Sequence, residues 1–283
     1  MRFMSYTADG QDGLAVWTEA AWRGLTATSP DFPGDLDAIV RSGDFAGAAA
    51  VLAKGDVVDP SAVTHALPFR RAGKVLCVGL NYAEHVSESK METPSFPTVF
   101  VRFNGNLIPH GAALVRPKVS EMFDYEGELV AVIGKAGRAI ALEDALDHVA
   151  GYTVFNDGSI RDFQLRTNQW TIGKNFDGTG AIGSEFVTAD ELPAGATGLR
   201  LQTRLNGQVL QDASTDQLIF SIAELISKLS IGMALQPGDL IVSGTPSGVG
   251  FSRTPKILMK PGDVCEVEIE RVGLLRNRVV AET

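Results

Sequence analysis

The sequence predicts a protein of mixed α and β structure in which short strands predominate. Apolar runs with β-branched residues, such as residues 74–78 and 129–133, are bounded by turns that contain Gly or Pro, as strands commonly are. The dipeptide Asn206-Gly207 separates two such runs and is a strong signal for a hairpin with a primed turn. Helical signals are few and short, and the clearest is the capping box of Ser221 and Glu224.

The N-terminal part of the chain is expected to form a small domain over residues 1–68, followed by the main domain at 69–283. Within it, short strands are predicted at residues 2–6 and 14–18 and short helices at 36–42 and 45–54. None of these segments has the residue types of a catalytic site. His65, close to Pro68, is therefore given a structural role.

The main domain is predicted to contain mostly strands. Beyond those named above, they are expected at residues 98–103, 151–155, 239–243, 256–259, 264–270 and 274–280, with short helices at 142–148 and from 221 to about 229. The polar segment 89–97 holds two prolines and is a candidate for a mobile lid.

Composition narrows the class of protein. A formal net charge of −9, with no run of Lys or Arg, argues against a nucleic-acid surface. The two cysteines, Cys77 and Cys265, form neither a disulfide framework nor a metal-ligand spacing, so a reducing cytoplasm is expected. The N-terminus lacks the apolar core of a signal peptide, and no apolar run approaches the length of a membrane span.

The most informative stretch runs from Phe123 to Gly134. In a strand, side chains two apart share a face, which puts Glu126 and Glu128 on one side with Cα atoms roughly 6.5–7 Å apart. Two carboxylates that close repel each other and resist burial unless something neutralises them. A hard divalent cation with oxygen ligands would do so, as Mg²⁺ does. The alternative is an acidic edge strand that faces water.

Residues elsewhere could complete such a site. Asp157, at the end of a predicted strand, could supply a third carboxylate, or it could simply cap the turn that follows. Arg161 and Gln164 lie three apart and could together contact a substrate carboxylate, unless Arg161 pairs with Asp162 in solvent.

Two further segments carry candidate catalytic groups. If residues 83–88 are helical, His85 and Glu88 are neighbours, and the carboxylate could orient the imidazole as a catalytic base. An exposed polar turn is the simpler interpretation. Lys174 ends an apolar stretch and could polarise a substrate oxygen, or it could be an ordinary surface lysine. The loop 244–250 could turn backbone N–H groups and the Thr245 hydroxyl toward an anion.

Residues 178–183 match the pattern G-x-G-x-x-G, but no strand precedes them and no long helix is predicted after them. The dinucleotide-binding interpretation is therefore rejected.

In their order and spacing these segments resemble the fumarylacetoacetate hydrolase family, in particular its bacterial acylpyruvate and fumarylpyruvate hydrolase-like members. The similarity covers roughly residues 70–283. It is carried by residues 79–82 with His85 and Glu88, 124–128, Asn156-Asp157 with Arg161-Asp162 and Gln164, Gly173-Lys174, and 243–250.

The resemblance implies an α+β fold of layered mixed sheets rolled around the active site, a homodimer, and a role in aromatic catabolism. It implies that Glu126, Glu128 and Asp157 bind Mg²⁺ or Mn²⁺, with Ca²⁺ as a further candidate. It also implies that His85 and Glu88 form a base dyad on a lid. Lys174, Arg161, Gln164 and Thr245 are similar to the family's substrate and oxyanion contacts.

The activity implied is hydrolysis of a carbon–carbon bond in a 2,4-diketo acid through an enolate. Decarboxylation of oxaloacetate or isomerisation of a keto acid at the same site remains open, and so does a non-catalytic protein that binds keto acids. The chain departs from the family at Arg102-Phe103, where many members have Lys-Pro, and at residues 178–181, where many have Cys-Pro. We expect Arg102 to contact a second substrate carboxylate.

Overall fold

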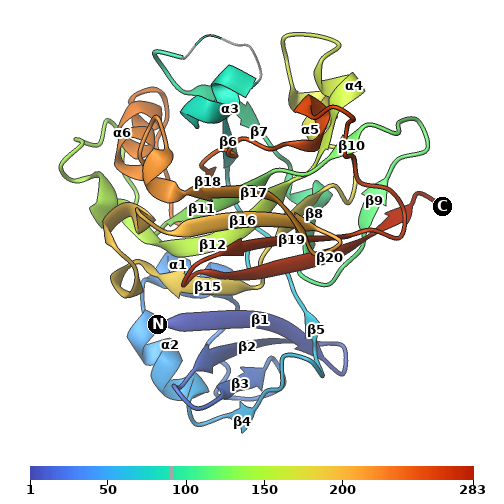
Figure 1. Cartoon of the computed structure of the whole chain (residues 1–283). Helices are drawn as coiled ribbons and strands as arrows, with labels where there is room; N and C mark the ends of the chain where they lie inside the picture. The colour runs from blue at the N-terminus through green and yellow to red at the C-terminus, as the bar shows by residue number, and fades with distance from the viewer. Residues whose placement is uncertain (89–91, 93) are drawn as a thin grey trace.

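A computed structural model of the chain describes residues 1–88, 92 and 94–283 (Figure 1). Part of the predicted lid, residues 89–91 and 93, lies outside the described residues. The structure is α+β, with strands arranged in layers of mixed sheet and few helices, as predicted. Among the described residues, no helix has both the length and the apolarity needed to cross a membrane.

The largest sheet has 13 strands and runs through the centre of the molecule. Its main path is β4 (Asp56–Val57), β3 (Trp22–Thr26), β2 (Gln11–Trp17), β1 (Arg2–Ala8), β15 (Glu185–Thr188), β12 (Val149–Asp157), β11 (Gly127–Ile133), β18 (Leu240–Val242), β6 (Val75–Gly79) and β7 (Thr98–Val101). Off this path lie β5 (Thr64–His65), β8 (Leu107–Pro109) and β14 (Gly180–Ile182).

Two smaller sheets complete the strand structure. A five-stranded sheet lies in front of the large one in Figure 1, in the order β17 (Gln208–Ser214), β16 (Arg200–Leu205), β19 (Val264–Ile269), β20 (Gly273–Ala281) and β9 (Leu114–Arg116). A two-stranded sheet pairs β10 (Phe123–Asp124) with β13 (Ser159–Ile160). The β16–β17 hairpin turns at Asn206 and Gly207, both with positive φ, as predicted.

The helices are short. They are α1 (Leu36–Ser42), α2 (Phe45–Leu52), α3 (Ala83–Glu88), α4 (Arg161–Gln164), α5 (Thr171–Lys174) and α6 (Ile222–Gly232). The 3₁₀ turns are η1 (Asn104–Asn106), η2 (Ala145–His148), η3 (Ala189–Glu191), η4 (Ala194–Ala196), η5 (Thr215–Gln217) and η6 (Gly250–Ser252). In the capping box that opens α6, the hydroxyl of Ser221 accepts from the Glu224 N–H and the Glu224 carboxylate accepts from the Ser221 N–H, so this prediction is confirmed.

The central strand β11 is buried along its whole length because both of its faces are covered. Leu129, Ala131 and Ile133 point into a core shared with the five-stranded sheet and α6. Val130 and Val132 point to the opposite core, which includes side chains of α1 and α2. The near-continuous apolar run thus reflects a strand with a packed layer on each side. Glu128 shares the face of Val130 and Val132, since side chains alternate along a strand.

The N-terminal segment extends the central sheet. Strand β1 pairs with β15, with Phe3 opposite Phe186, so β1 to β4 continue the same sheet. Phe3 and Leu14 belong to the same apolar core as Val130. The division of the chain at residue 68 into two domains stays a prediction.

Several predicted elements differ from the structure. Residues 256–259, predicted as a strand, have no strand pairing, since Pro255 and Pro261 bracket the segment. The helix predicted at 142–148 is the short 3₁₀ turn η2. The strand β3, which the sequence analysis missed, pairs with β2 from Gly13 to Trp17.

Candidate active site

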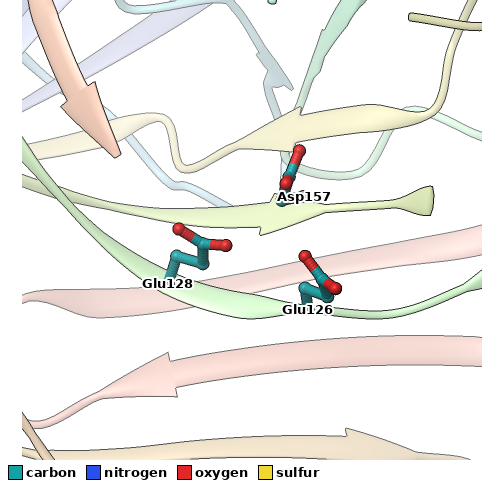
Figure 2. Close-up of side chains that lie close together, drawn as sticks. All are labelled: Glu126, Glu128 and Asp157. Carbon is teal, nitrogen blue, oxygen red and sulfur yellow. The ribbon is translucent and has the colours of Figure 1, made fainter. Parts of the chain in front are cut away.

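Three carboxylates from two neighbouring strands meet beside the end of β12. Glu126 stands just before β11, Glu128 lies within it, and Asp157 ends the antiparallel neighbour β12. One carboxylate oxygen from each lies within 4.8 Å of the others, and Figure 2 shows the three side chains close together on their strands. All three are buried, so the edge strand facing water, the alternative that the sequence left open, is wrong.

Buried cations compensate two of these acids. Lys174 Nζ lies 2.6 Å from Glu126 and 2.5 Å from Asp157. Arg161 Nη2 adds a contact of 2.7 Å to Glu126. Burial raises the pKa of Glu126, but Arg161 and Lys174 outweigh it and bring the pKa to about 2. Glu126 is therefore ionised at neutral pH.

Glu128 is the member of the cluster whose negative charge has no basic side chain in contact with it among the described residues. It accepts one described hydrogen bond, from the Gly244 N–H at 2.6 Å. Burial, followed by the charges of Asp157 and Glu126, raises its pKa well above the usual range. A divalent cation shared by the three oxygens would relieve this repulsion, and three hard carboxylate oxygens suit Mg²⁺, Mn²⁺ or Ca²⁺. The residues present therefore fit the metal that the sequence implied.

The helix α3 brings a histidine to the same cavity. His85 Nδ1 lies 3.4 Å from Glu88 Oε2, at the i, i+3 spacing expected on a helix. The Gly248 N–H donates to both Glu88 oxygens at 3.1 Å, which anchors the carboxylate. His85 is only 8% exposed, so the simple exposed turn is not what the structure shows.

The loop 244–250 directs backbone N–H groups at anions, but the anions are the protein's own carboxylates. Gly244 donates to Glu128, Gly248 to Glu88, and Gly250 to Asp124 at 2.8 Å. A single loop thereby positions acids that come from three different segments.

These groups line a cavity of about 360 Å³. Its polar part includes His85, Glu88, Glu126, Glu128, Arg161, Gln164, Lys174, Thr245 and Ser252. Its apolar part includes Val78, Leu80, Phe100, Trp170, Val249 and Phe251. Asp157 is fully buried behind this surface. The structure thus gathers nine of the ten predicted site residues in or directly beside one cavity.

Arg102 is the exception. Its side chain is fully buried, and its Nε lies 2.8 Å from Asp157 Oδ1. Its Nη2 donates to the Gly158 carbonyl at 2.7 Å, and its guanidinium packs where Gly180 leaves room for it. The predicted contact with a substrate carboxylate is therefore corrected. Arg102 contacts the carboxylate of Asp157 on the side away from the cavity, so its charge is paired with a group of the protein.

The predicted substrate contacts are partly occupied by protein groups. Arg161 donates to Asp124 and to Gln164 Oε1, each at 2.9 Å. The Thr245 hydroxyl donates to the Gly127 carbonyl and accepts from Gln211 Nε2 at 2.8 Å. Their roles toward a substrate stay predictions.

The sequence analysis gave no role to two residues that shape the site. Gln211 also accepts from the Gly127 N–H at 3.0 Å, so it braces both Thr245 and the start of β11. Asn156 accepts from the Glu126 N–H at 3.0 Å. Asn156 could have been found from its place beside Asp157, whereas Gln211 follows a hairpin turn and carries no sequence signal.

Layers of mixed sheet around a cavity with a buried carboxylate cluster define an α+β protein with a site suited to a hard cation. The chain belongs to the fumarylacetoacetate hydrolase family: the profile described as "Fumarylacetoacetate (FAA) hydrolase C-terminal" matches residues 74–280.

Relatives that are named for an activity do not share one activity. The human protein named "Oxaloacetate tautomerase FAHD2A, mitochondrial" is 38% identical over 90% of this chain and 83% of its own length. The fumarylacetoacetate hydrolase structure from Exiguobacterium antarcticum has a TM-score of 0.85 and 30% identity, with all of both chains covered. The fumarylpyruvate hydrolase of Pseudomonas aeruginosa, in complex with Mn²⁺ and pyruvate, has a TM-score of 0.68 and 36% identity over 76% of this chain and 91% of that one.

Proposed function

We propose that this protein is a metal-dependent hydrolase that cleaves a carbon–carbon bond in a 2,4-diketo acid of the acylpyruvate type. The observation that carries the proposal is the cluster of Glu126, Glu128 and Asp157, in one site with a histidine base and a charged lysine. The Pseudomonas aeruginosa relative binds Mn²⁺ and pyruvate, and pyruvate is the product expected from such a cleavage.

The metal is proposed to be Mg²⁺ or Mn²⁺, held by Glu126, Glu128 and Asp157. When bound, such an ion supplies Lewis-acid polarisation of a keto oxygen and orients the substrate carboxylate beside it. The preference of the three oxygens for Mn²⁺, Mg²⁺ or Ca²⁺ can be measured from the thermal stabilisation that each ion produces.

The base is proposed to be His85. With its Nδ1 directed at Glu88, the ring can take a proton from water at its other nitrogen, and the carboxylate stabilises the imidazolium that forms. The hydroxide equivalent adds to the distal carbonyl, and the bond to the neighbouring CH₂ then breaks. Its electron pair becomes the enolate of pyruvate, which is released after it takes up a proton.

Lys174 is proposed to stabilise the enolate charge. Burial lowers the pKa of this amine, but Asp157 and Glu126 outweigh burial and raise it, so it is an ammonium at neutral pH. A fixed ammonium in a water-poor cavity stabilises developing negative charge without reorganisation.

The test is turnover of a substrate panel by protein freed of metal with a chelator and reloaded with Mn²⁺ or Mg²⁺. Acetopyruvate and fumarylpyruvate should each give pyruvate and the corresponding acid, detected by ¹H NMR, and chelator should stop the reaction. Failure to release pyruvate from any diketo acid with either metal would refute the hydrolase proposal.

A second candidate is keto–enol tautomerisation of oxaloacetate, the activity for which the human relative is named. This reaction needs a base and an enolate-stabilising site but no attacking water. Decay of the enol absorbance of oxaloacetate, measured without pyruvate release, would favour it. Decarboxylation would instead release pyruvate and CO₂.

We also propose that the protein acts as a homodimer, which the family resemblance implies, and that it resides in the cytoplasm. Light scattering on the purified protein should give about twice the 30.1 kDa of one chain. The human relative is named as a mitochondrial protein, so localisation of the tagged protein is the direct test.

A further inference from the structure

A second hollow lies next to the catalytic cavity. Its volume is about 440 Å³, and it shares Leu80, Phe100 and Trp170 with the catalytic cavity of about 360 Å³. The rest of its lining comes from β7 and from residues 168, 169 and 171. None of the residues described as lining it carries a charge. The two spaces therefore share a wall that contains three apolar side chains.

Trp170 is the largest side chain in this wall. Its ring packs directly on the backbone of Gly79, where an added Cβ would lie 2.2 Å from the indole. On another side it meets Phe100 edge-on, with ring centroids 5.7 Å apart. The ring is thus held in place by β6 and β7 together.

The same short turn carries Trp170 and Lys174. The Lys174 N–H donates to the Trp170 carbonyl at 3.2 Å, so the two residues are four apart on one helical turn. Lys174 Nζ also lies 4.9 Å from the centroid of the Phe100 ring. The wall is consequently adjacent to the group proposed to stabilise the enolate, and a substrate tail leaving the polar part of the cavity in this direction meets Trp170.

We propose that Trp170 is a specificity-determining residue that closes the apolar end of the catalytic cavity and limits the length of the acyl tail. The proposal rests on the proposed function, since it assumes a keto-acid head at the carboxylate cluster. The uncharged lining of the second hollow suits an extended, uncharged acyl chain, so removal of the indole should admit longer straight-chain substrates.

The test uses binding, so that it does not depend on turnover. Straight-chain 2-oxo acids from pyruvate to 2-oxodecanoate are titrated into Mn²⁺-loaded wild-type protein, Trp170→Ala and Trp170→Phe, by calorimetry. Wild-type affinity should stop rising after the first few carbons. In Trp170→Ala it should continue to rise by about fourfold for each added methylene that enters the second hollow. Trp170→Phe should show a smaller gain, because a phenyl ring vacates less space.

The matched control is Trp17→Ala, a tryptophan 43% exposed on β2 that lines neither space. It should keep the wild-type chain-length profile. If folded Trp170→Ala and Trp170→Phe both keep that profile as well, the inference is wrong while the proposed function stands. If wild-type protein binds no 2-oxo acid in a Mn²⁺-dependent way, the proposed function fails, and this inference fails with it.

Discussion

Replacing Glu128 with Gln should stabilise the metal-free protein, and bound metal should cancel most or all of that gain. Glu128 has no cationic partner among the described contacts, whereas Glu126 and Asp157 each contact two basic side chains. The amide keeps the shape of the side chain and can still accept from the Gly244 N–H. It removes only the charge, which is the destabilising feature of this position in the metal-free protein.

The magnitude follows from the geometry. Two unit charges 4.8 Å apart repel by roughly 3.5 kcal/mol at an effective dielectric constant of about 20. The nearby cations offset part of this repulsion, so Glu128→Gln should stabilise the metal-free protein by about 1–3 kcal/mol. At this chain size, each kcal/mol raises Tm by roughly 2–4 °C.

Metal should cancel most or all of this gain. At a concentration 100 times its Kd, an ion stabilises the wild-type protein by about 2.7 kcal/mol. Loss of one of three anionic ligands should weaken binding by at least about 100-fold, which leaves roughly 0.4 kcal/mol at the same concentration.

The assay is thermal unfolding followed by circular dichroism, in chelator and in excess Mn²⁺. The matched control is Glu121→Gln, whose side chain is 89% exposed, and it should stay within about 0.5 kcal/mol of wild type in both conditions. A lower Tm for Glu128→Gln in chelator, or full stabilisation of this variant by Mn²⁺, would show that the three acids do not form one metal site.

Three further predictions address the base, the residue behind the metal site and the histidine at the N-terminal strands. His85→Ala should lower kcat for diketo-acid hydrolysis by about 10²–10⁴ with unchanged Mn²⁺ affinity; a parallel loss of metal binding, measured by electron paramagnetic resonance, would contradict a base role. Arg102→Leu should weaken Mn²⁺ binding by about 10–100-fold, because the partner of Arg102 is Asp157. The KM values of monoacid and dicarboxylic substrates should change alike. A KM effect confined to dicarboxylic substrates would restore the substrate-contact interpretation. Burial, and then the nearby His110, lowers the pKa of His65 from 6.5 to about 4. The unfolded chain therefore binds the proton more readily than the folded protein does. The free energy of unfolding should consequently be highest above pH 6.5 and fall as the pH approaches 4. Because His65 is partly exposed, the loss should be only about 1–2 kcal/mol, and urea unfolding of His65→Gln should show a flatter pH dependence.

Local spacing was sufficient to predict which groups lie side by side wherever both belong to one element or one hairpin. The period of two in a strand placed Glu126 and Glu128 on the same face, and β11 has that alternation. The i, i+3 spacing placed His85 beside Glu88, and the primed turn placed β16 against β17. These relations depend only on backbone geometry within a few residues, which the sequence specifies.

Other local signals were misleading because flanking residues or tertiary contacts outweighed them. The apolar stretch 256–259 has the composition of a strand, yet it lies between two prolines and forms only single hydrogen bonds, such as that from Met259 N–H to the Phe123 carbonyl. Arg102 was assigned to substrate from its charge, but the charge serves Asp157.

From the amino-acid order alone came most of the longer strands, the β16–β17 hairpin turn, the family and the identity of the candidate metal ligands and base. Only the folded chain determined that β1 joins β15, that Asp157 meets Glu126 and Glu128, and that Trp170 stands between two hollows. The reason is that spacing along one element follows from its own backbone period. Distances between separate segments depend instead on sheet register and on how the layers pack, which many residues set together.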